Sequence, residues 1–176
     1  MRYDVVIIGA GAAGFGCALT LGSANDKFDW AKDKKYLILD DNKSDLNVGK
    51  YFNVAGVDSG INGVDLLLKM KKQLEIYKDV ELKDEKATKI ENLGEYFKVI
   101  TENSTYEASI VVLATGLHKF DIECEGVNVK DNIFVPKPNN IYLENSNNLI
   151  SKNLYVAGLA SGTPTMFSCA SGDGAK

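Results

Sequence analysis

Four short apolar runs give this chain its main hydrophobic pattern. They occupy residues 3–8, 36–39, 110–113 and 153–158, and polar stretches separate them. Almost continuous apolar runs of this length are typical of strands that are buried on both faces of a parallel sheet. The pattern therefore predicts an α/β protein with a Rossmann-like, doubly wound parallel sheet.

Between the second and third runs the pattern predicts a helix and then several short strands. Apolar residues at helical spacing predict an amphipathic helix over residues 63–77, with Asn62 as its N-cap and Asp65 three residues further on. Extended pieces follow at residues 80–82, 87–91, 96–101 and 105–108. Because turn-forming residues separate the later ones, they predict an antiparallel β-meander attached to the main sheet.

The last third of the chain is polar until the fourth apolar run. Residues 117–152 are rich in loop formers, with short extended pieces near residues 133–135 and 141–143. After the fourth run, Thr163-Pro164 predicts the start of a helix, because proline is favoured in a first turn. We interpret residues 1–176 as one domain, in which residues 117–152 form a short linker region.

The first apolar run leads directly into a G-x-G-x-x-G sequence, from Gly9 to Gly14. In that pattern Gly9 permits a tight turn, Gly11 lets backbone approach phosphate groups, and Gly14 lets the following helix pack close to the strand. The N-terminus of that helix offers unpaired N–H groups and a partial positive charge. These features predict a site for a dinucleotide pyrophosphate; the alternative is a tight strand–helix turn that binds nothing.

An acidic residue stands where such a site needs one. The second apolar run ends in Asp40-Asp41, and an acid at this place binds the hydroxyl groups of the ribose. The spacing from the glycines is long because residues 22–35 form a polar, charged connection, which we expect at the surface. Asp40, the first residue after the run, is the better candidate. An acid here disfavours a 2′-phosphate, which argues against NADP.

Composition excludes several classes of function. The chain of 176 residues is long enough for a substantial core, and its net charge of −4 with scattered lysines argues against nucleic acid as a partner. No apolar run approaches the roughly 20 residues that span a bilayer, and the first run is the nucleotide strand rather than a secretion signal. We therefore expect a cytoplasmic protein with no membrane partner.

Three cysteines and one histidine limit the chemistry of the side chains. Cys17, Cys124 and Cys169 form no C-x-x-C pair, which argues against a disulfide scaffold and against a zinc site, so we expect no metal. Cys17 and Cys169 lie among small apolar residues, a pattern that favours core packing. His118, directly after Ala114-Thr115-Gly116, is the one titratable candidate near the predicted site, and a surface histidine is the alternative. We assign no catalytic residue.

In their order along the chain, these motifs resemble the FAD-binding domain of thioredoxin-reductase-like flavoproteins, within the pyridine nucleotide–disulfide oxidoreductase group. The resemblance covers nearly the whole chain. It rests on the glycine motif at residues 9–14, the Phe52-Asn53-x-x-Gly56 loop, the meander, and the Val-Leu-Ala-Thr-Gly and Leu-Tyr-Val-Ala-Gly sequences at residues 112–116 and 154–158. It implies an oxidoreductase that uses FAD.

The resemblance also implies which residues bind this cofactor. Asn53 would lie near the flavin and Ala87 near the adenine, while the helix after Pro164 would point its N–H groups at the pyrimidine end of the flavin. Such a helix end stabilises negative charge on the reduced flavin. The complete expected set is Gly9, Ala10, Gly11, Ala12, Ala13, Gly14, Asp40, Asp41, Asn53, Ala87, Ala114, Thr115, Gly116, Gly158, Leu159, Thr165, Met166 and Phe167.

The chain departs from that family in three respects. Residues 117–152 are too few for the NADPH-binding domain that family members insert there. The redox-active cysteine pair is missing. The acid that follows the glycine of the last strand, and binds the ribityl chain of the flavin, is Leu159 here. Backbone groups or the hydroxyls of Ser161 and Thr163 would have to make that contact.

The leading hypothesis is an FAD-binding flavoprotein of oxidoreductase type, which accepts or passes electrons through its flavin. The electrons would come from a redox partner protein or from NAD(P)H that binds transiently, and analogy with the family suggests a homodimer. Two alternatives stay open. One is a non-catalytic protein that binds FAD or its ADP part for sensing or structure, and the other is an NAD-binding module.

Overall fold

A computed structural model describes residues 2–25 and 27–176. Its main sheet holds parallel strands in the order β5-β2-β1-β8-β13. These strands are β1 (Arg2–Ile8), β2 (Tyr36–Asp40), β5 (Val80–Asp84), β8 (Thr105–Leu113) and β13 (Leu154–Val156). The parallel part confirms the Rossmann-like sheet, and all its carboxyl ends lie along one edge, where such sheets bind ligands.

The predicted meander is confirmed and shares a strand with the parallel sheet. β6 (Ala87–Asn92) pairs with β7 (Phe97–Thr101), and β7 pairs with the first half of β8, both antiparallel. The second half of β8 pairs with β13 instead. The sequence predicted two strands here, at residues 105–108 and 110–113, and this was wrong. The backbone stays extended through Ser109, because β8 pairs with β1 along most of its length.

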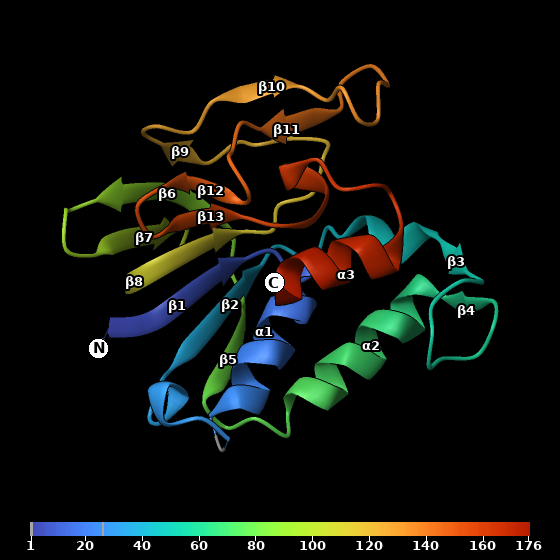
Figure 1. The fold of residues 1–176 in the computed structure, drawn as a ribbon, viewed down its shortest axis with the longest axis horizontal. Coiled ribbons are helices and arrows are strands. Elements are labelled where there is room, and N and C mark those ends of the chain that lie inside the picture. The colour runs from blue at the N-terminus through green and yellow to red at the C-terminus, as the bar shows by residue number, and fades with distance from the viewer. Residues whose placement is uncertain (1, 26) are drawn as a thin grey trace.

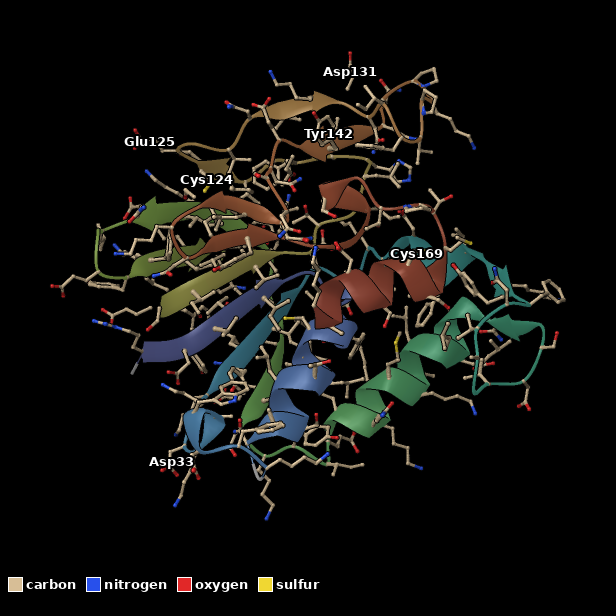
Figure 2. All side chains as sticks on the ribbon, viewed as in Figure 1. Asp33, Cys124, Glu125, Asp131, Tyr142 and Cys169 are labelled. Atoms are coloured by element: carbon tan, nitrogen blue, oxygen red, sulfur yellow. The ribbon has the colours of Figure 1, made fainter. Side chains whose placement is uncertain are left out.

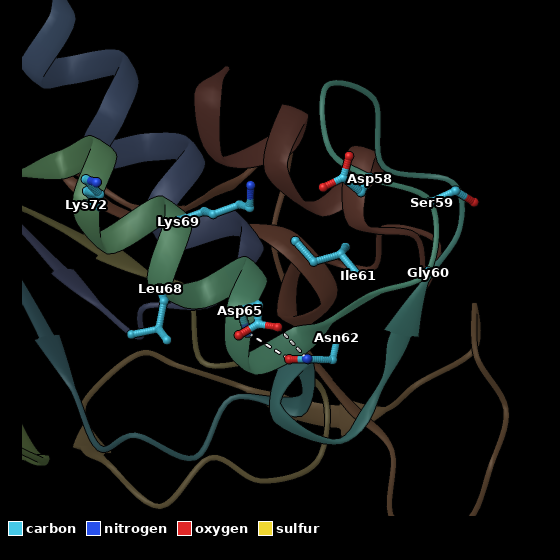
Figure 3. Close-up of a pocket in the computed structure, with 9 residues that line it drawn as sticks. All are labelled: Asp58, Ser59, Gly60, Ile61, Asn62, Asp65, Leu68, Lys69 and Lys72. Carbon is cyan, nitrogen blue, oxygen red and sulfur yellow. Dashed lines mark hydrogen bonds between the residues drawn. The ribbon is translucent and has the colours of Figure 1, made fainter.

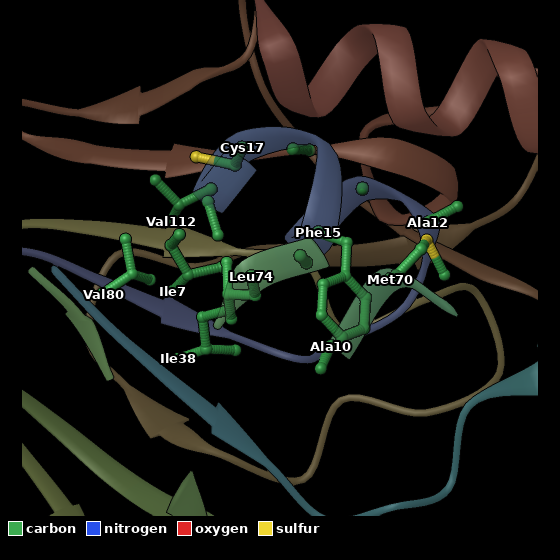
Figure 4. Packing of buried hydrophobic residues seen from close by; sticks show 14 of the residues in the cluster. Ile7, Ala10, Ala12, Phe15, Cys17, Ile38, Met70, Leu74, Val80 and Val112 are labelled. Carbon is green, nitrogen blue, oxygen red and sulfur yellow. The ribbon is translucent and has the colours of Figure 1, made fainter. Parts of the chain in front are cut away.

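The helices α1 (Ala12–Ala24), α2 (Gly63–Leu74) and α3 (Phe167–Ala175) gather on one face of the parallel sheet (Figure 1). Side chains that alternate along each strand separate two hydrophobic clusters. Ile7 and Ile38 face the helices and pack with Phe15 and Met70, as Figure 4 shows. The other cluster packs the opposite face against the meander and the segments that follow it.

Two helix predictions had different outcomes. The cap of α2 is confirmed, since the Asn62 side-chain oxygen accepts a hydrogen bond from the Asp65 N–H at 2.8 Å, although the helix ends at Leu74. The predicted start of α3 at Pro164 was wrong, because α3 begins at Phe167. Met166 is its N-cap, with extended dihedral angles of φ −114° and ψ 138°. The Pro164 carbonyl oxygen instead accepts a hydrogen bond from the Met166 N–H at 2.7 Å, in a turn that precedes the helix.

Short strands and 3-10 turns complete the fold. The remaining strands are β3 (Lys50–Tyr51), β4 (Ile61–Asn62), β9 (Glu123–Cys124), β10 (Val129–Asp131), β11 (Ile141–Leu143) and β12 (Leu149–Ser151), and the 3-10 turns are η1 (Asp29–Ala31), η2 (Asp45–Val48) and η3 (Gly158–Ser161). The extended piece at residues 141–143 is thus confirmed. The piece at 133–135 is instead a turn, in which the Asn132 side chain accepts hydrogen bonds from the N–H groups of Phe134 and Val135.

In the polar connection over residues 22–35, α1 continues to Ala24 and η1 follows, and residue 26 lies outside the described residues. Residues 117–152 contain no helix. No helix in the described part of the chain is long and apolar enough to cross a membrane, and no group of metal-ligating side chains is found there.

Candidate functional site

A cavity of about 820 Å³ lies at the carboxyl edge of the parallel strands. Its walls come from the turn after β1, the ends of β2 and β8, the start of β6, η2, and the segment that leads into α3. Cavities of roughly 300–1,000 Å³ are typical of sites for small molecules and cofactors. The cavity therefore lies where a Rossmann-like parallel sheet is expected to bind its ligand.

The three glycines of the first turn have different surroundings. Gly9 has a positive φ of 104°, and a Cβ there would collide with the carbonyl oxygen of Ala114. A Cβ on Gly14 would collide with the carbonyl oxygen of Gly9. At Gly11, in contrast, the nearest atom to a Cβ would be the Ser44 hydroxyl oxygen at 3.4 Å. Gly9 and Gly14 thus serve the fold, while Gly11 leaves space on the cavity side.

The N-terminus of α1 faces this cavity without a side-chain cap. Gly11 is the N-cap, it provides no side-chain capping bond, and the first turn contains no acidic residue. The first N–H groups of a helix have no partner within the helix and together carry a partial positive charge. The turn and helix therefore form a site suited to an anion such as a pyrophosphate.

Asp40 is buried at the end of β2, with only 6% of its surface exposed. One carboxylate oxygen accepts a hydrogen bond from the Ala10 N–H at 3.0 Å, which ties the glycine turn to β2. Burial raises the pKa of Asp40, and the bond from Ala10 partly opposes that shift. Asp40 also lines the cavity, where a carboxylate suits a donor such as a ribose hydroxyl.

Several charged side chains line the cavity. Asp121 accepts hydrogen bonds from Lys119 at 2.8 Å and Lys86 at 2.7 Å, and these two lysines lower its pKa to about 2. The His118 Nε2 atom lies 3.4 Å from a carboxylate oxygen of Asp45 on η2. His118 is exposed and lines the cavity. Sequence reasoning found His118 but missed the two lysines and Asp121, because the fold alone brings these separate residues together.

Thr115 supplies a polar group that lacks a partner. Its hydroxyl oxygen is buried and has no hydrogen-bond partner in the described part of the chain, and the residue lines the cavity. A buried hydroxyl without a partner is costly, and such groups often mark the place of a ligand or water. A polar atom of a bound ligand would satisfy this hydroxyl.

Most of the expected cofactor-binding residues lie together around the cavity. Of the expected residues, those that line the cavity are Gly9, Ala10, Gly11, Ala12, Ala13, Asp40, Asp41, Ala87, Ala114, Thr115, Gly116, Leu159, Thr165, Met166 and Phe167. Gly14 packs beneath the turn, and the Gly158 N–H is bound to Asp173. Asn53 lies exposed in the loop between β3 and β4, which carries it away from the cavity. Leu46, Val48 and Tyr51, which sequence reasoning did not assign, line the cavity near that hairpin.

The three cysteines lie on separate elements, as Figure 2 shows for Cys124 and Cys169 and Figure 4 for Cys17. None of them is among the residues that line the cavity. Cys17 is buried in α1, as expected, and burial raises the pKa of its thiol to about 12. Burial also raises the pKa of Cys124, in β9, to about 11. Cys169 is half-buried in α3 rather than fully within the core. No pair of thiols is therefore placed to act as a disulfide centre beside the cavity.

A second, open cleft of about 520 Å³ lies beside the first turns of α2 (Figure 3). Its residues include Asp58, Leu68 and Lys69, together with the Asn62 and Asp65 pair that caps the helix. It lies away from the strand ends that form the main cavity, and the polar groups of its capping pair are already bound to each other.

A family model described as pyridine nucleotide-disulphide oxidoreductase matches residues 3–158 of this sequence. The chain belongs to this family. A search of curated proteins by sequence found no significant match. The family assignment agrees with the order of the cavity motifs along the chain, from the glycine turn after β1 to the glycine after β13.

Solved structures with the same fold include an oxidoreductase from Agrobacterium tumefaciens, with a TM-score of 0.78, 13% identity, and coverage of 99% of this chain and 95% of that one. A ferredoxin-flavin thioredoxin reductase from Clostridium acetobutylicum has a TM-score of 0.73 and 16% identity, covering 99% and 94%. The thioredoxin reductase of Lactococcus lactis is 31% identical, with a TM-score of 0.56, over 69% of this chain and 38% of that one. The chain thus spans little more than a third of that enzyme.

These comparisons support a thioredoxin-reductase-like FAD-binding domain that lacks the NADPH domain, and they indicate FAD as the cofactor. The residues present fit this group. The cavity has a suitable volume, Gly11 leaves space beside the uncapped end of α1, and the Thr115 hydroxyl needs a partner. The coarse role that follows is that of an FAD-binding protein of oxidoreductase type.

Proposed function

We propose that this protein is a flavoprotein oxidoreductase that accepts and passes electrons through FAD held in the main cavity. The observation that carries the proposal is the uncapped N-terminus of α1, which opens, together with Gly11, onto the cavity that also contains Thr115 and the segment before α3. When bound, FAD supplies the redox chemistry, and the protein supplies binding, orientation and electrostatics.

The lining residues suggest how the chain orients the cofactor. The α1 N-terminus would hold the pyrophosphate, Asp40 the ribose, and Ala87 the adenine. The flavin would lie toward Leu159 and residues 165–167, which line the cavity next to α3. The N-terminus of α3 has no side-chain cap and no acidic residue in its first turn. Its partial positive charge would stabilise negative charge on a reduced flavin and so raise the reduction potential.

The electron donor follows from two features of the chain. Residues 117–152 form short strands and loops without a helix, so they provide no second Rossmann-like unit for NADPH. The cavity has no cysteine in its walls. We therefore infer that electrons arrive from a redox partner protein or from NAD(P)H bound transiently at the flavin. By analogy with the family, a homodimer is the assembly to test first.

A second candidate is a protein that binds FAD, or only its ADP part, without catalysis. Leu159 favours it, because this leucine lines the cavity on the side where the flavin would lie and has no polar side-chain atom to bind it. This side chain would weaken the hold on the flavin half while leaving the glycine turn and Asp40 intact. The two candidates share one cavity and differ in whether electrons pass.

Anaerobic reduction of the purified, FAD-loaded protein separates the two candidates. NADH, NADPH and reduced methyl viologen, a low-potential one-electron donor, are added in turn while the flavin absorbance is followed, and dithionite serves as the positive control. The proposal predicts bleaching by at least one of the three donors and reoxidation by an added acceptor. Bleaching by dithionite alone would support the passive binder, and a protein that takes up no flavin would contradict both candidates.

A further inference from the structure

Asp173, in the last turn of α3, accepts three hydrogen bonds from two separate segments through one carboxylate oxygen. Its Oδ2 atom accepts hydrogen bonds from the Gly158 N–H at 2.8 Å, the Ser161 hydroxyl at 2.7 Å and the Asn148 side-chain amide at 2.9 Å. An acidic side chain near a helix C-terminus is opposed by the helix dipole. The position is therefore poor for the helix itself, and what Asp173 contributes is the set of bonds to its neighbours.

The backbone group that Asp173 binds lies within the wall of the main cavity. Ala157 and Leu159 both line the cavity, and Gly158 stands between them. Gly158 has a φ of 73°, in the left-handed region, and a Cβ there would collide with Ala13, another lining residue. The hydrogen bond that the Gly158 N–H donates to Asp173 thus fixes the left-handed turn that sets where Leu159 faces the cavity.

The other two bonds extend this anchor to the end of β13 and to η3. Asn148 also donates to the carbonyl oxygen of Val156 at 3.0 Å. The Ser161 hydroxyl oxygen lies 2.8 Å from the carbonyl oxygen of Gly158 as well, within the same turn. Asp173 therefore connects the carboxyl end of β13, the 3-10 turn η3 and the helix α3.

The helix α3 is itself locked against α1 by close backbone contact. A Cβ on Gly174 would collide with the carbonyl oxygen of Ala13, and a Cβ on Gly16 would collide with that of Ser171. Because Asp173 lies in the part of α3 that packs closely on α1, its hydrogen bond with the Gly158 N–H fixes the Gly158 turn relative to α1. The two helix N-termini that face the cavity are thereby held in one fixed relation.

We propose that Asp173 is a positioning residue for the flavin end of the cofactor. It holds the turn Gly158–Ser161 from the helix side, next to Leu159, which lines the cavity. The inference rests on the proposed function, because it assigns the flavin to this end of the cavity. Loss of the anchor would let η3 and the start of α3 move, which would misalign the α3 N–H groups and lower the reduction potential of bound FAD.

The test compares Asp173→Ala, Asp173→Asn and the control Asp131→Ala, which removes an exposed acid of β10 shown in Figure 2. Asparagine keeps an oxygen that can accept the same hydrogen bonds, so it should rescue the alanine defect. The first measurement is hydrogen exchange over residues 157–167 without FAD, and the second is the reduction potential with FAD. Because three hydrogen bonds are lost, Asp173→Ala should exchange about tenfold faster in this segment.

The two measurements separate the possible outcomes. Faster exchange confined to residues 157–167, with a lower FAD potential in Asp173→Ala and near-normal values in Asp173→Asn and Asp131→Ala, supports the proposal. Unchanged exchange overturns it. Faster exchange with an unchanged potential shows a purely structural role and also overturns it. Wild-type protein that binds no FAD contradicts the proposed function and, with it, the assignment of Asp173 to a flavin.

Discussion

Gly11 provides the sharpest separation between fold and cofactor binding. Its dihedral angles, φ −81° and ψ −163°, are accessible to alanine, and a Cβ there would meet only the Ser44 hydroxyl oxygen, at 3.4 Å. The side chain would nevertheless stand beside the uncapped N–H groups of α1. We therefore predict that Gly11→Ala folds normally and binds FAD poorly.

For Gly11→Ala, the change in the free energy of unfolding follows from two opposing effects, and the change in FAD affinity follows from a third. Alanine at an N-cap is less favourable than glycine by roughly 0.5–1 kcal/mol. The reduced entropy of the unfolded chain returns about 0.4–1 kcal/mol, so the net change in the free energy of unfolding should be under about 1 kcal/mol. Displacing one charge-assisted bond to the pyrophosphate costs about 1.5–3 kcal/mol, which corresponds to an FAD affinity about 10- to 100-fold lower.

Urea denaturation of the apoprotein and titration with FAD measure the two quantities separately. Gly172→Ala is the matched control, because a Cβ there meets nothing within 4 Å, and it should keep wild-type affinity. Gly14→Ala is the contrasting variant, since its Cβ collides with backbone and should destabilise the fold by about 1–3 kcal/mol. Wild-type FAD affinity in a folded Gly11→Ala protein would refute the assignment of the pyrophosphate to this turn.

Three further predictions concern the polar residues around the cavity. Burial raises the pKa of Asp40, so its contribution to the stability of the apoprotein is complete below the ordinary aspartate pKa of about 3.9 and is lost as the pH rises through the raised value. The Asp40→Asn variant can still accept the hydrogen bond from the Ala10 N–H. In urea melts from pH 4 to 7 this variant should no longer lose stability with rising pH, while its FAD binding should weaken. The pKa of Asp121 is lowered to about 2, so its stabilising contribution is present above about pH 4 and disappears as the pH falls toward 2. An NMR titration of the Asp121 carboxyl group with a midpoint near 4 would contradict its contact with Lys86 and Lys119. The Thr115→Val variant removes a buried hydroxyl that has no hydrogen-bond partner, so the apoprotein should become more stable by about 1 kcal/mol. Its FAD binding should weaken. A less stable apoprotein would show that the hydroxyl already has a partner.

The parts of this fold that could be predicted are those that local sequence determines. The glycine turn, the strand before it and Asp40 at the end of β2 are all defined by neighbouring residues, and the structure places them together at the cavity. The predicted start of α3 at Pro164 was wrong, because a proline in the sequence does not show that Met166 adopts an extended conformation and that the helix begins only at Phe167. Asn53 was expected at the cavity from the family motif, yet the β3–β4 hairpin carries it into solvent.

Long-range polar contacts were beyond sequence reasoning for a different reason. Asp173 and Asn148 are 25 positions apart, and Lys86 and Asp121 are 35 apart. Single polar residues at such separations leave no periodicity and no motif, because the three-dimensional fold alone decides which of them meet. The arrangement of charges and anchors around the cavity therefore emerges only from the structure.

We propose above all that one FAD binds this chain with its pyrophosphate at the N-terminus of α1. Titration of the apoprotein with FAD, followed by the change in the visible flavin spectrum and repeated with ADP as competitor, tests it directly. The spectral change should saturate at one FAD per chain, and ADP should displace the flavin. A spectrum that does not change on adding FAD, together with no binding of ADP, would contradict it.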